Sequence, residues 1–129
     1  MSKNYDVISA HYAASDCGDL AGMMAPITAE TRWMEMAGFP YAGTYIGPQA
    51  IIDGVFKRIG ADWEGYSFKL QSLHDANGTI IGVGTYGGVF RATGKTMSAR
   101  VVHVWTMKDG KAESFEQFTD TKLVADAMV

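Results

Sequence analysis

The sequence predicts an α+β fold in which helices cover the concave face of a cone-shaped, curved sheet of mixed or antiparallel strands. Apolar residues recur at helical spacing before Pro26, between Pro48 and Gly60, and near the C-terminus. The intervening chain alternates apolar and polar residues and carries two strong hairpin signals, Asn77-Gly78 and Asp109-Gly110. Runs of helix followed by runs of strand are typical of α+β domains, and a sheet curved over helices encloses a cavity. We expect a single domain spanning residues 1–129.

Two short helices are expected at the start of the chain. Aromatic and aliphatic residues recur at three- and four-residue steps from Asn4 to about Ser15, with Asn4 as the cap. A second helix is expected from Leu20 to about Ala25, capped by Asp19 and buried through its leucine and methionines. The two helices would lie over the sheet as a lid.

The first strand is expected from Glu30 to Met36. Thr31, Trp33 and Glu35 then share one face, because side chains alternate along a strand. The following segment, residues 38–48, is rich in glycine, proline and aromatic residues and is expected to be a loop.

A longer helix is expected from Pro48 to Gly60. Proline suits the first helical position, and the residues that follow form one broad apolar stripe. Strands are then expected over residues 66–71, 79–93 and 95–107 and after Gly110, and a helix over residues 121–128, capped by Asp120.

The turn around Asp109-Gly110 decides which side chains face the cavity. A three-residue loop, Lys108 to Gly110, places His103 opposite Phe115, and gathers one face from the residues Ala99, Val101, His103, Trp105, Phe115, Gln117 and Thr119. A two-residue turn would instead place His103 opposite Glu116 and turn Gln117 to the other face, because a one-residue slip flips every side chain. We favour the three-residue loop, since it leaves the charged residues on the outer face.

Composition excludes several classes of function. The net charge of −3 argues against a nucleic-acid-binding surface, and no apolar run is long enough for a membrane span. Cys17 is the single cysteine, so an intrachain disulfide is impossible and a cytoplasmic location is expected. His11 and His74 have no partners at metal-ligand spacing, so no metal is expected.

Several motifs together resemble the SnoaL-like polyketide cyclases, within the larger group that includes nuclear transport factor 2 and ketosteroid isomerase. The resemblance covers nearly the whole chain, and the segments that carry it are Gly18-Asp19-Leu20, Trp33, residues 42–51, 91–95 and 103–111, and Phe115 to Thr121. It implies a cystatin-like α+β roll without a cofactor. The same fold hosts cyclases, isomerases, dehydratases, epoxide hydrolases and non-catalytic binders.

The resemblance implies three candidate catalytic residues. His103 matches the histidine that such cyclases direct into the cavity. Gln117 stands where the cyclases have an acidic general base, and an amide cannot take up a proton at neutral pH, so their mechanism does not transfer unchanged. Ketosteroid isomerase places its base near the end of the first strand, where Glu35 is the nearest acidic residue.

Each candidate also has a structural interpretation. His103 can act as acid or base or be a core histidine, and Gln117 can stabilise an oxyanion or only bond to His103. Aromatic residues can line a substrate pocket or form plain core; the candidates are Trp33, Tyr45, Tyr86, Trp105 and Phe115.

Two functions therefore remain open. One is an enzyme that binds an apolar or polycyclic carbonyl compound and catalyses cyclisation, isomerisation or dehydration by acid–base chemistry. The other is a non-catalytic ligand-binding or dimerisation domain. The outer face of the sheet carries Val102, Val104 and Phe118, which is apolar enough for a homodimer.

Overall fold

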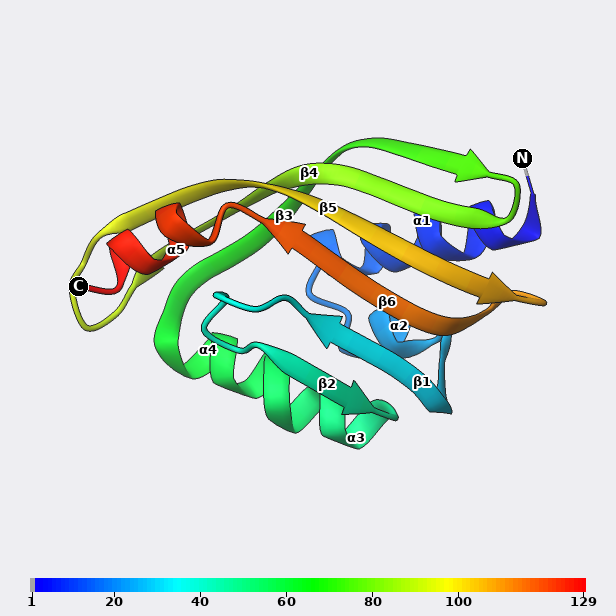
Figure 1. Cartoon of the computed structure of the whole chain (residues 1–129), viewed down its shortest axis with the longest axis horizontal. Helices are drawn as coiled ribbons and strands as arrows, with labels where there is room; N and C mark the ends of the chain where they lie inside the picture. The colour runs from blue at the N-terminus through cyan, green and yellow to red at the C-terminus, as the bar shows by residue number, and fades with distance from the viewer. Residues whose placement is uncertain (1) are drawn as a thin grey trace.

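A strongly curved, six-stranded sheet forms the body of the computed structural model, which describes residues 2–129 (Figure 1). The strands are β1 (Ile27–Glu35), β2 (Gly43–Ile46), β3 (Trp63–Ala76), β4 (Thr79–Phe90), β5 (Thr96–Lys108) and β6 (Lys111–Thr119). Their order across the sheet is β2-β1-β6-β5-β4-β3. The β1–β6 pair is parallel and the other neighbours are antiparallel, so the predicted mixed sheet is confirmed.

Helices cover the concave side of the sheet, as predicted. They are α1 (Lys3–Asp16), α2 (Leu20–Met24), α3 (Pro48–Ile51), the π-helical turn η1 (Ile52–Phe56), α4 (Lys57–Asp62) and α5 (Thr121–Ala127). Figure 1 shows α1 along the far side of β3–β5, and α3 and α4 behind β2. None of the helices in residues 2–129 has the length and apolar character needed to cross a membrane.

The predicted helix α1 is present, but its cap is not Asn4. The Ser2 hydroxyl accepts the hydrogen bond from the Tyr5 N–H and caps the helix. Asn4 instead accepts a hydrogen bond from the Gly110 N–H at 2.9 Å, which fastens α1 to the tip of the β5–β6 hairpin. The capping prediction failed because the asparagine has a tertiary partner.

Helix α2 follows its predicted cap, Asp19, but the predicted burial of its side chains is wrong. No α2 residue is buried, and Leu20 is 42% exposed. The helix is a single short turn at the edge of α1, so it lacks a partner surface on its outer side.

The segment 38–48 is not entirely a loop. Its end forms β2, which pairs antiparallel with β1 at the edge of the sheet, Trp33 lying opposite Tyr45. A short edge strand that contains glycine has only a weak sequence pattern, so it is difficult to predict. Pro48 does occupy the first position of α3.

The β5–β6 hairpin has the predicted inner face but not the predicted register. Asp109 and Gly110 form a two-residue turn with φ values of 51° and 78°. His103 lies opposite Gln117 rather than Phe115, and the register shifts by one residue between Thr106 and Met107. This bulge lies within the strand, where the turn signal gives no information, and it restores Gln117 to the inner face.

Burial alternates along β5 and separates the two faces of the sheet. Ala99, Val101, His103 and Trp105 are buried, whereas Val102 and Val104 between them are only partly buried. The inner face therefore carries the core and the side chains that reach the cavity.

Candidate functional site

A cavity of about 730 Å³ lies between the concave face of the sheet, α1 and the helical segment 48–62. Its walls are largely apolar and include Trp33, Phe56, Phe68 and Phe115. A cavity of this volume holds a small organic molecule.

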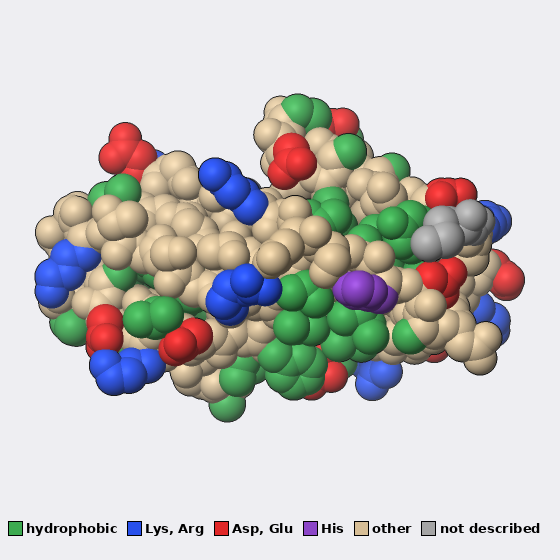
Figure 2. Space-filling view, turned by 90° about the horizontal axis from the view of Figure 1, so that it is seen from above, with side chains coloured by type: hydrophobic (Ala, Val, Ile, Leu, Met, Phe, Trp, Pro, Cys, Tyr) green, Lys and Arg blue, Asp and Glu red, His purple; other side chains and the backbone are tan. Residues whose placement is uncertain are grey.

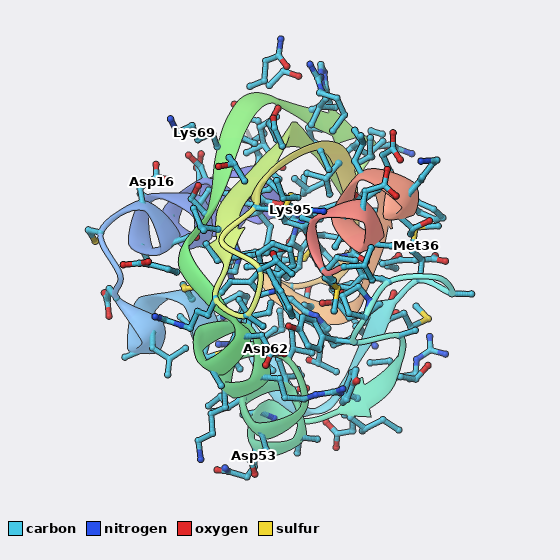
Figure 3. All side chains as sticks on the ribbon, turned by 90° about the vertical axis from the view of Figure 1, so that its left-hand side faces the viewer. Asp16, Met36, Asp53, Asp62, Lys69 and Lys95 are labelled. Atoms are coloured by element: carbon cyan, nitrogen blue, oxygen red, sulfur yellow. The ribbon has the colours of Figure 1, made fainter. Side chains whose placement is uncertain are left out.

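The cavity opens between the end of α1 and β3. Asp16, at the end of α1, and Lys69, on β3, both line it and are exposed. Figure 3 shows the two charged side chains on the same side of the molecule. The opening thus carries both signs of charge, while the interior is mostly apolar.

His103 is buried in the wall of this cavity with a tyrosine on each ring nitrogen. Its Nδ1 lies 2.7 Å from the Tyr12 hydroxyl and its Nε2 lies 2.7 Å from the Tyr86 hydroxyl. Phe68 stacks on the imidazole at a centroid distance of 4.5 Å. Burial lowers the pKa of His103 well below its ordinary value, with a smaller effect from nearby His11, so the ring is neutral.

Each tyrosine beside His103 also accepts a hydrogen bond from a second buried side chain. The Trp105 indole N–H donates to the Tyr12 hydroxyl at 3.0 Å, and the Gln117 amide donates to the Tyr86 hydroxyl at 3.0 Å. A neutral imidazole carries one N–H, so His103 donates to one of the two tyrosine hydroxyls and accepts from the other. If Nε2 carries the hydrogen, Tyr86 accepts two hydrogen bonds and its own O–H is free to donate to a ligand.

A glycine makes room for this chain of hydrogen bonds. Gly82 on β4 lies directly opposite His103 on β5. A Cβ atom at Gly82 would lie 2.7 Å from the Tyr12 hydroxyl oxygen, which is closer than such atoms approach. The glycine therefore allows α1 to bring Tyr12 onto the sheet.

Three buried polar atoms at the cavity have no hydrogen-bond partner among residues 2–129. They are Trp33 Nε1, Glu35 Oε2 and the Tyr66 hydroxyl oxygen. Buried polar groups are nearly always paired, so these atoms beside the cavity are candidates to bind polar atoms of a ligand. Trp33 and Glu35 lie two residues apart on the inner face of β1, and Tyr66 lies on β3.

The Glu35 carboxyl group has an unusual environment for an acid. It is 6% exposed, and burial raises its pKa to about 8, with a smaller opposing effect of the Trp33 indole. Tyr66 and Tyr86 are close enough that Glu35 contributes to raising the pKa of both hydroxyls, although burial is the larger cause. Near neutral pH this carboxyl group can therefore both release and take up a proton.

The structure brings together most of the residues that the sequence singled out. Trp33, Glu35, Tyr86, His103 and Phe115 all line the cavity. The sequence did not single out Tyr12 and Tyr66 as site residues, because each also fits an ordinary apolar pattern. The role of their hydroxyl groups depends on side chains that are distant in the sequence and become neighbours only in the folded structure.

Gln117, Trp105 and Tyr45 are not among the residues that line the cavity. Gln117 is fully buried behind Tyr86, where its Oε1 accepts a hydrogen bond from the Met36 N–H. Trp105 is buried behind Tyr12. Tyr45, on the edge strand β2, donates to the Tyr41 carbonyl oxygen at 2.7 Å. In the structure these three residues contact neighbouring side chains and backbone and do not line this cavity.

No three histidine, cysteine, aspartate or glutamate side chains within residues 2–129 are grouped as metal ligands. The polar groups inside the cavity are mainly phenol, indole, imidazole and the Glu35 carboxyl group, with Asp16 and Lys69 at the opening, a set suited to hydrogen bonding with an organic ligand.

Comparison with known proteins agrees with this fold. The SnoaL-like domain family matches residues 8–115. An NTF2-like protein from Burkholderia thailandensis is 54% identical, with a TM-score of 0.96 and coverage of 100% of this chain and 99% of that chain. No curated protein matches the sequence.

Two more distant structures share the fold alone. TerC, co-crystallised with polyporic acid, is 24% identical, with a TM-score of 0.87 and 98% of each chain covered. A hypothetical protein with a ketosteroid isomerase-like fold from Catenulispora acidiphila, in complex with trimethylamine, is 15% identical, with a TM-score of 0.80 and coverage of 95% of this chain and 91% of that chain. The domain match and the close structural relative together show that the chain belongs to the SnoaL-like family, with an NTF2-like cone fold.

Proposed function

We propose that the protein is an enzyme without a cofactor that binds an apolar or polycyclic carbonyl compound in the cavity and moves a proton beside the carbonyl group. The observation that carries this proposal is the Glu35 carboxyl group, buried in the cavity wall with a pKa of about 8 and an unpartnered oxygen. A base with a pKa near the working pH is well matched to proton transfer. TerC, which shares the fold, was crystallised with a small organic molecule.

In the proposed reaction, the Glu35 carboxylate removes a proton from the carbon next to the ligand carbonyl. The negative charge moves to the carbonyl oxygen, which accepts hydrogen bonds from the Tyr86 and Tyr66 hydroxyls. Glu35 then returns the proton to carbon. Isomerisation, cyclisation and dehydration can each proceed through such an enolate.

His103 holds the Tyr86 hydroxyl in place in this scheme. Both of its ring nitrogens are already occupied by tyrosines, so it is a positioning residue and does not exchange a proton with the ligand. Gln117 has the same role from the other side of Tyr86. In this proposal Glu35 transfers the proton, in place of His103, to which the sequence had assigned that role.

Deuterium exchange tests the proposal without knowledge of the natural substrate. Ketones of one to three rings, beginning with 2-tetralone, are incubated in D₂O with the protein, and loss of the proton signal beside the carbonyl is followed by NMR. We expect the wild type to accelerate exchange and Glu35→Gln to lose about 100-fold or more of the rate. An unchanged rate in Glu35→Gln would exclude Glu35 as the base.

The second candidate function is a non-catalytic binding domain. It is favoured by Gln117, an amide where the related cyclases have an acid, and by the occupied nitrogens of His103. Ketone binding to the wild type without any acceleration of exchange would support this alternative. A gain of exchange activity in Gln117→Asp would instead indicate a degenerate enzyme.

We further propose that the protein is a homodimer in the cytoplasm, formed through the outer face of the sheet. Phe118 on β6 is 44% exposed, and Val102 and Val104 beside it are partly buried. A separate group of hydrophobic side chains lies on the face seen from above in Figure 2, which is turned by 90° from the view of β5 and β6 in Figure 1. Apolar surface of this kind is suited to contact with a second copy.

A further inference from the structure

We propose that His11 determines ligand specificity, because its Nε2 accepts a hydrogen bond from a hydroxyl group of the ligand. The preferred ligand then carries a carbonyl group at one end of an apolar ring system and a hydroxyl group at another. This inference rests on the proposed function in one respect, since the carbonyl group is taken to bind near Glu35 and Tyr66.

The tautomer of His11 follows from its single hydrogen bond. Nδ1 lies 2.8 Å from the Met23 carbonyl oxygen, which can only accept, so Nδ1 carries the hydrogen. A neutral imidazole has one such hydrogen, and Nε2 is left with a lone pair. Burial lowers the pKa of His11 to about 4, with a smaller opposing effect of the Met23 bond, which keeps the ring neutral at pH 7.

The Nε2 atom has no hydrogen-bond partner in the part of the chain that the structure describes, and it is not among the buried unpaired polar atoms. His11 lines the cavity although only 4% of its surface is exposed. Since His11 lines the cavity, we take Nε2 to be an acceptor available to a ligand there.

The position of His11 separates it from the polar atoms of Trp33 and Glu35. The rings of His11 and Trp33 both pack edge-on against Trp105, at centroid distances of 4.7 Å and 5.6 Å. The His11 and Trp33 rings thus both line the cavity and both pack against Trp105, which is buried behind the cavity wall. A rigid skeleton of two or three rings can reach both.

Because the His11 ring is neutral, its Nε2 atom favours a ligand donor that is also neutral. An ammonium group bound beside His11 would need a counter-charge, but Glu35 is largely protonated at pH 7 and the other lining carboxyl group, Asp16, lies at the exposed opening. A hydroxyl group satisfies Nε2 without this cost, and a methoxy group in its place leaves Nε2 unpaired.

Substitution by asparagine separates ligand recognition from folding. The asparagine amide can still donate to the Met23 carbonyl oxygen, since its nitrogen lies where Nδ1 lies, but it places nothing at Nε2. His11→Phe removes both functions and serves as the comparison. We expect His11→Asn to unfold at a temperature close to that of the wild type and His11→Phe at a lower one.

The experiment compares the affinities of 2-tetralone, its 5-, 6- and 7-hydroxy derivatives and the matching methoxy compounds, measured by NMR titration. We expect the wild type to bind at least one hydroxy isomer roughly tenfold more tightly than its methoxy partner. His11→Asn should lose this preference, which is a ratio of two affinities in the same protein and so does not depend on a general change in affinity. The ¹⁵N resonance of His11 Nε2 should also shift when the hydroxy isomer binds to the wild type.

Two results would overturn the inference. One is the absence of a preference for any hydroxy isomer in the wild type. This result does not depend on whether a variant folds. The other is a preference that survives in His11→Asn. Neither result bears on Glu35, whose failure appears as unchanged deuterium exchange in Glu35→Gln, so the inference and the proposed function can fail separately.

Discussion

The hydroxyl oxygen of Tyr86 lies 2.7 Å from Nε2 of His103, in the interior of the protein. The same hydroxyl accepts a hydrogen bond from Gln117, so two residues of the β5–β6 hairpin hold one tyrosine of β4. The hairpin thus supports the tyrosine that faces the cavity, and the chemistry is proposed for Glu35 on the neighbouring part of the sheet.

Removal of the Tyr86 hydroxyl should affect both stability and exchange. Tyr86→Phe leaves the Gln117 amide and His103 Nε2 without their partner, which should cost about 1–3 kcal/mol of unfolding free energy. Loss of an oxyanion donor should also lower ketone exchange by about 100-fold or more. Urea denaturation and NMR exchange measure the two effects, with Tyr5→Phe at a partly exposed position as the control. Full activity in Tyr86→Phe would exclude its role as the donor.

The pKa of Glu35 predicts how stability changes with pH. Since the pKa rises from 4.5 to about 8 on folding, the folded state holds a proton that the unfolded state releases between these values. The stabilising effect is complete below pH 4.5 and is lost as the pH rises through about 8. Each pKa unit corresponds to about 1.4 kcal/mol.

Glu35→Gln should remove this dependence, because glutamine stays neutral. We expect the variant to gain stability relative to the wild type as the pH rises from 5 to 9. The lowered pKa values of His11 and His103 act in the other direction, and both proteins should lose stability as the pH falls below 6.5. Thermal unfolding across this range tests the prediction, and parallel curves for the two proteins would contradict it.

Gly54 should be intolerant of a side chain, whereas Gly60 in the same helical segment should not. A Cβ at Gly54 would lie 2.2 Å from the Tyr45 ring, and nothing lies within 4 Å of one at Gly60. Gly54→Ala should therefore cost about 1–3 kcal/mol through overpacking. Gly60→Ala should gain about 0.5–1 kcal/mol, because glycine weakens a helix interior. Chemical denaturation of both variants measures the difference, and equal stabilities would show that the Tyr45 ring moves freely.

The proposed dimer predicts a difference between two equally exposed residues. Phe118 lies on the outer face of β6 and is 44% exposed, and Leu123 on α5 is 45% exposed. Light scattering should give twice the 14.0 kDa mass for the wild type and for Leu123→Glu. Phe118→Glu should shift the protein toward the monomer. A monomeric wild type at micromolar concentration would refute the proposal.

Local signals in the sequence predicted much of the fold. The helical spacing of Ile8 and Tyr12, the Asp19 and Asp120 caps and the two glycine-containing turns all lie where they were expected. These features depend on interactions within a few residues, so the sequence itself contains them.

The sequence could not give the register of the β5–β6 hairpin or the edge strand β2. The bulge between Thr106 and Met107 depends on which residues of two strands fit together, and no single turn signal encodes this. The residues of the inner face were still predicted correctly. Side chains alternate along each strand, and the apolar set must be the buried one.

By itself, the sequence determined the family, the class of fold and the inward face that carries Glu35 and His103. Only the tertiary structure decided their surroundings, because two tyrosines from α1 and β4 occupy both nitrogens of His103, while Glu35 is left with an unpartnered oxygen beside the cavity. It also showed that the His11 ring is held by a hydrogen bond to the Met23 carbonyl oxygen, which leaves Nε2 as an acceptor. Proton affinity and hydrogen-bonding capacity depend on burial and on partners distant in the chain, and the fold alone supplies both.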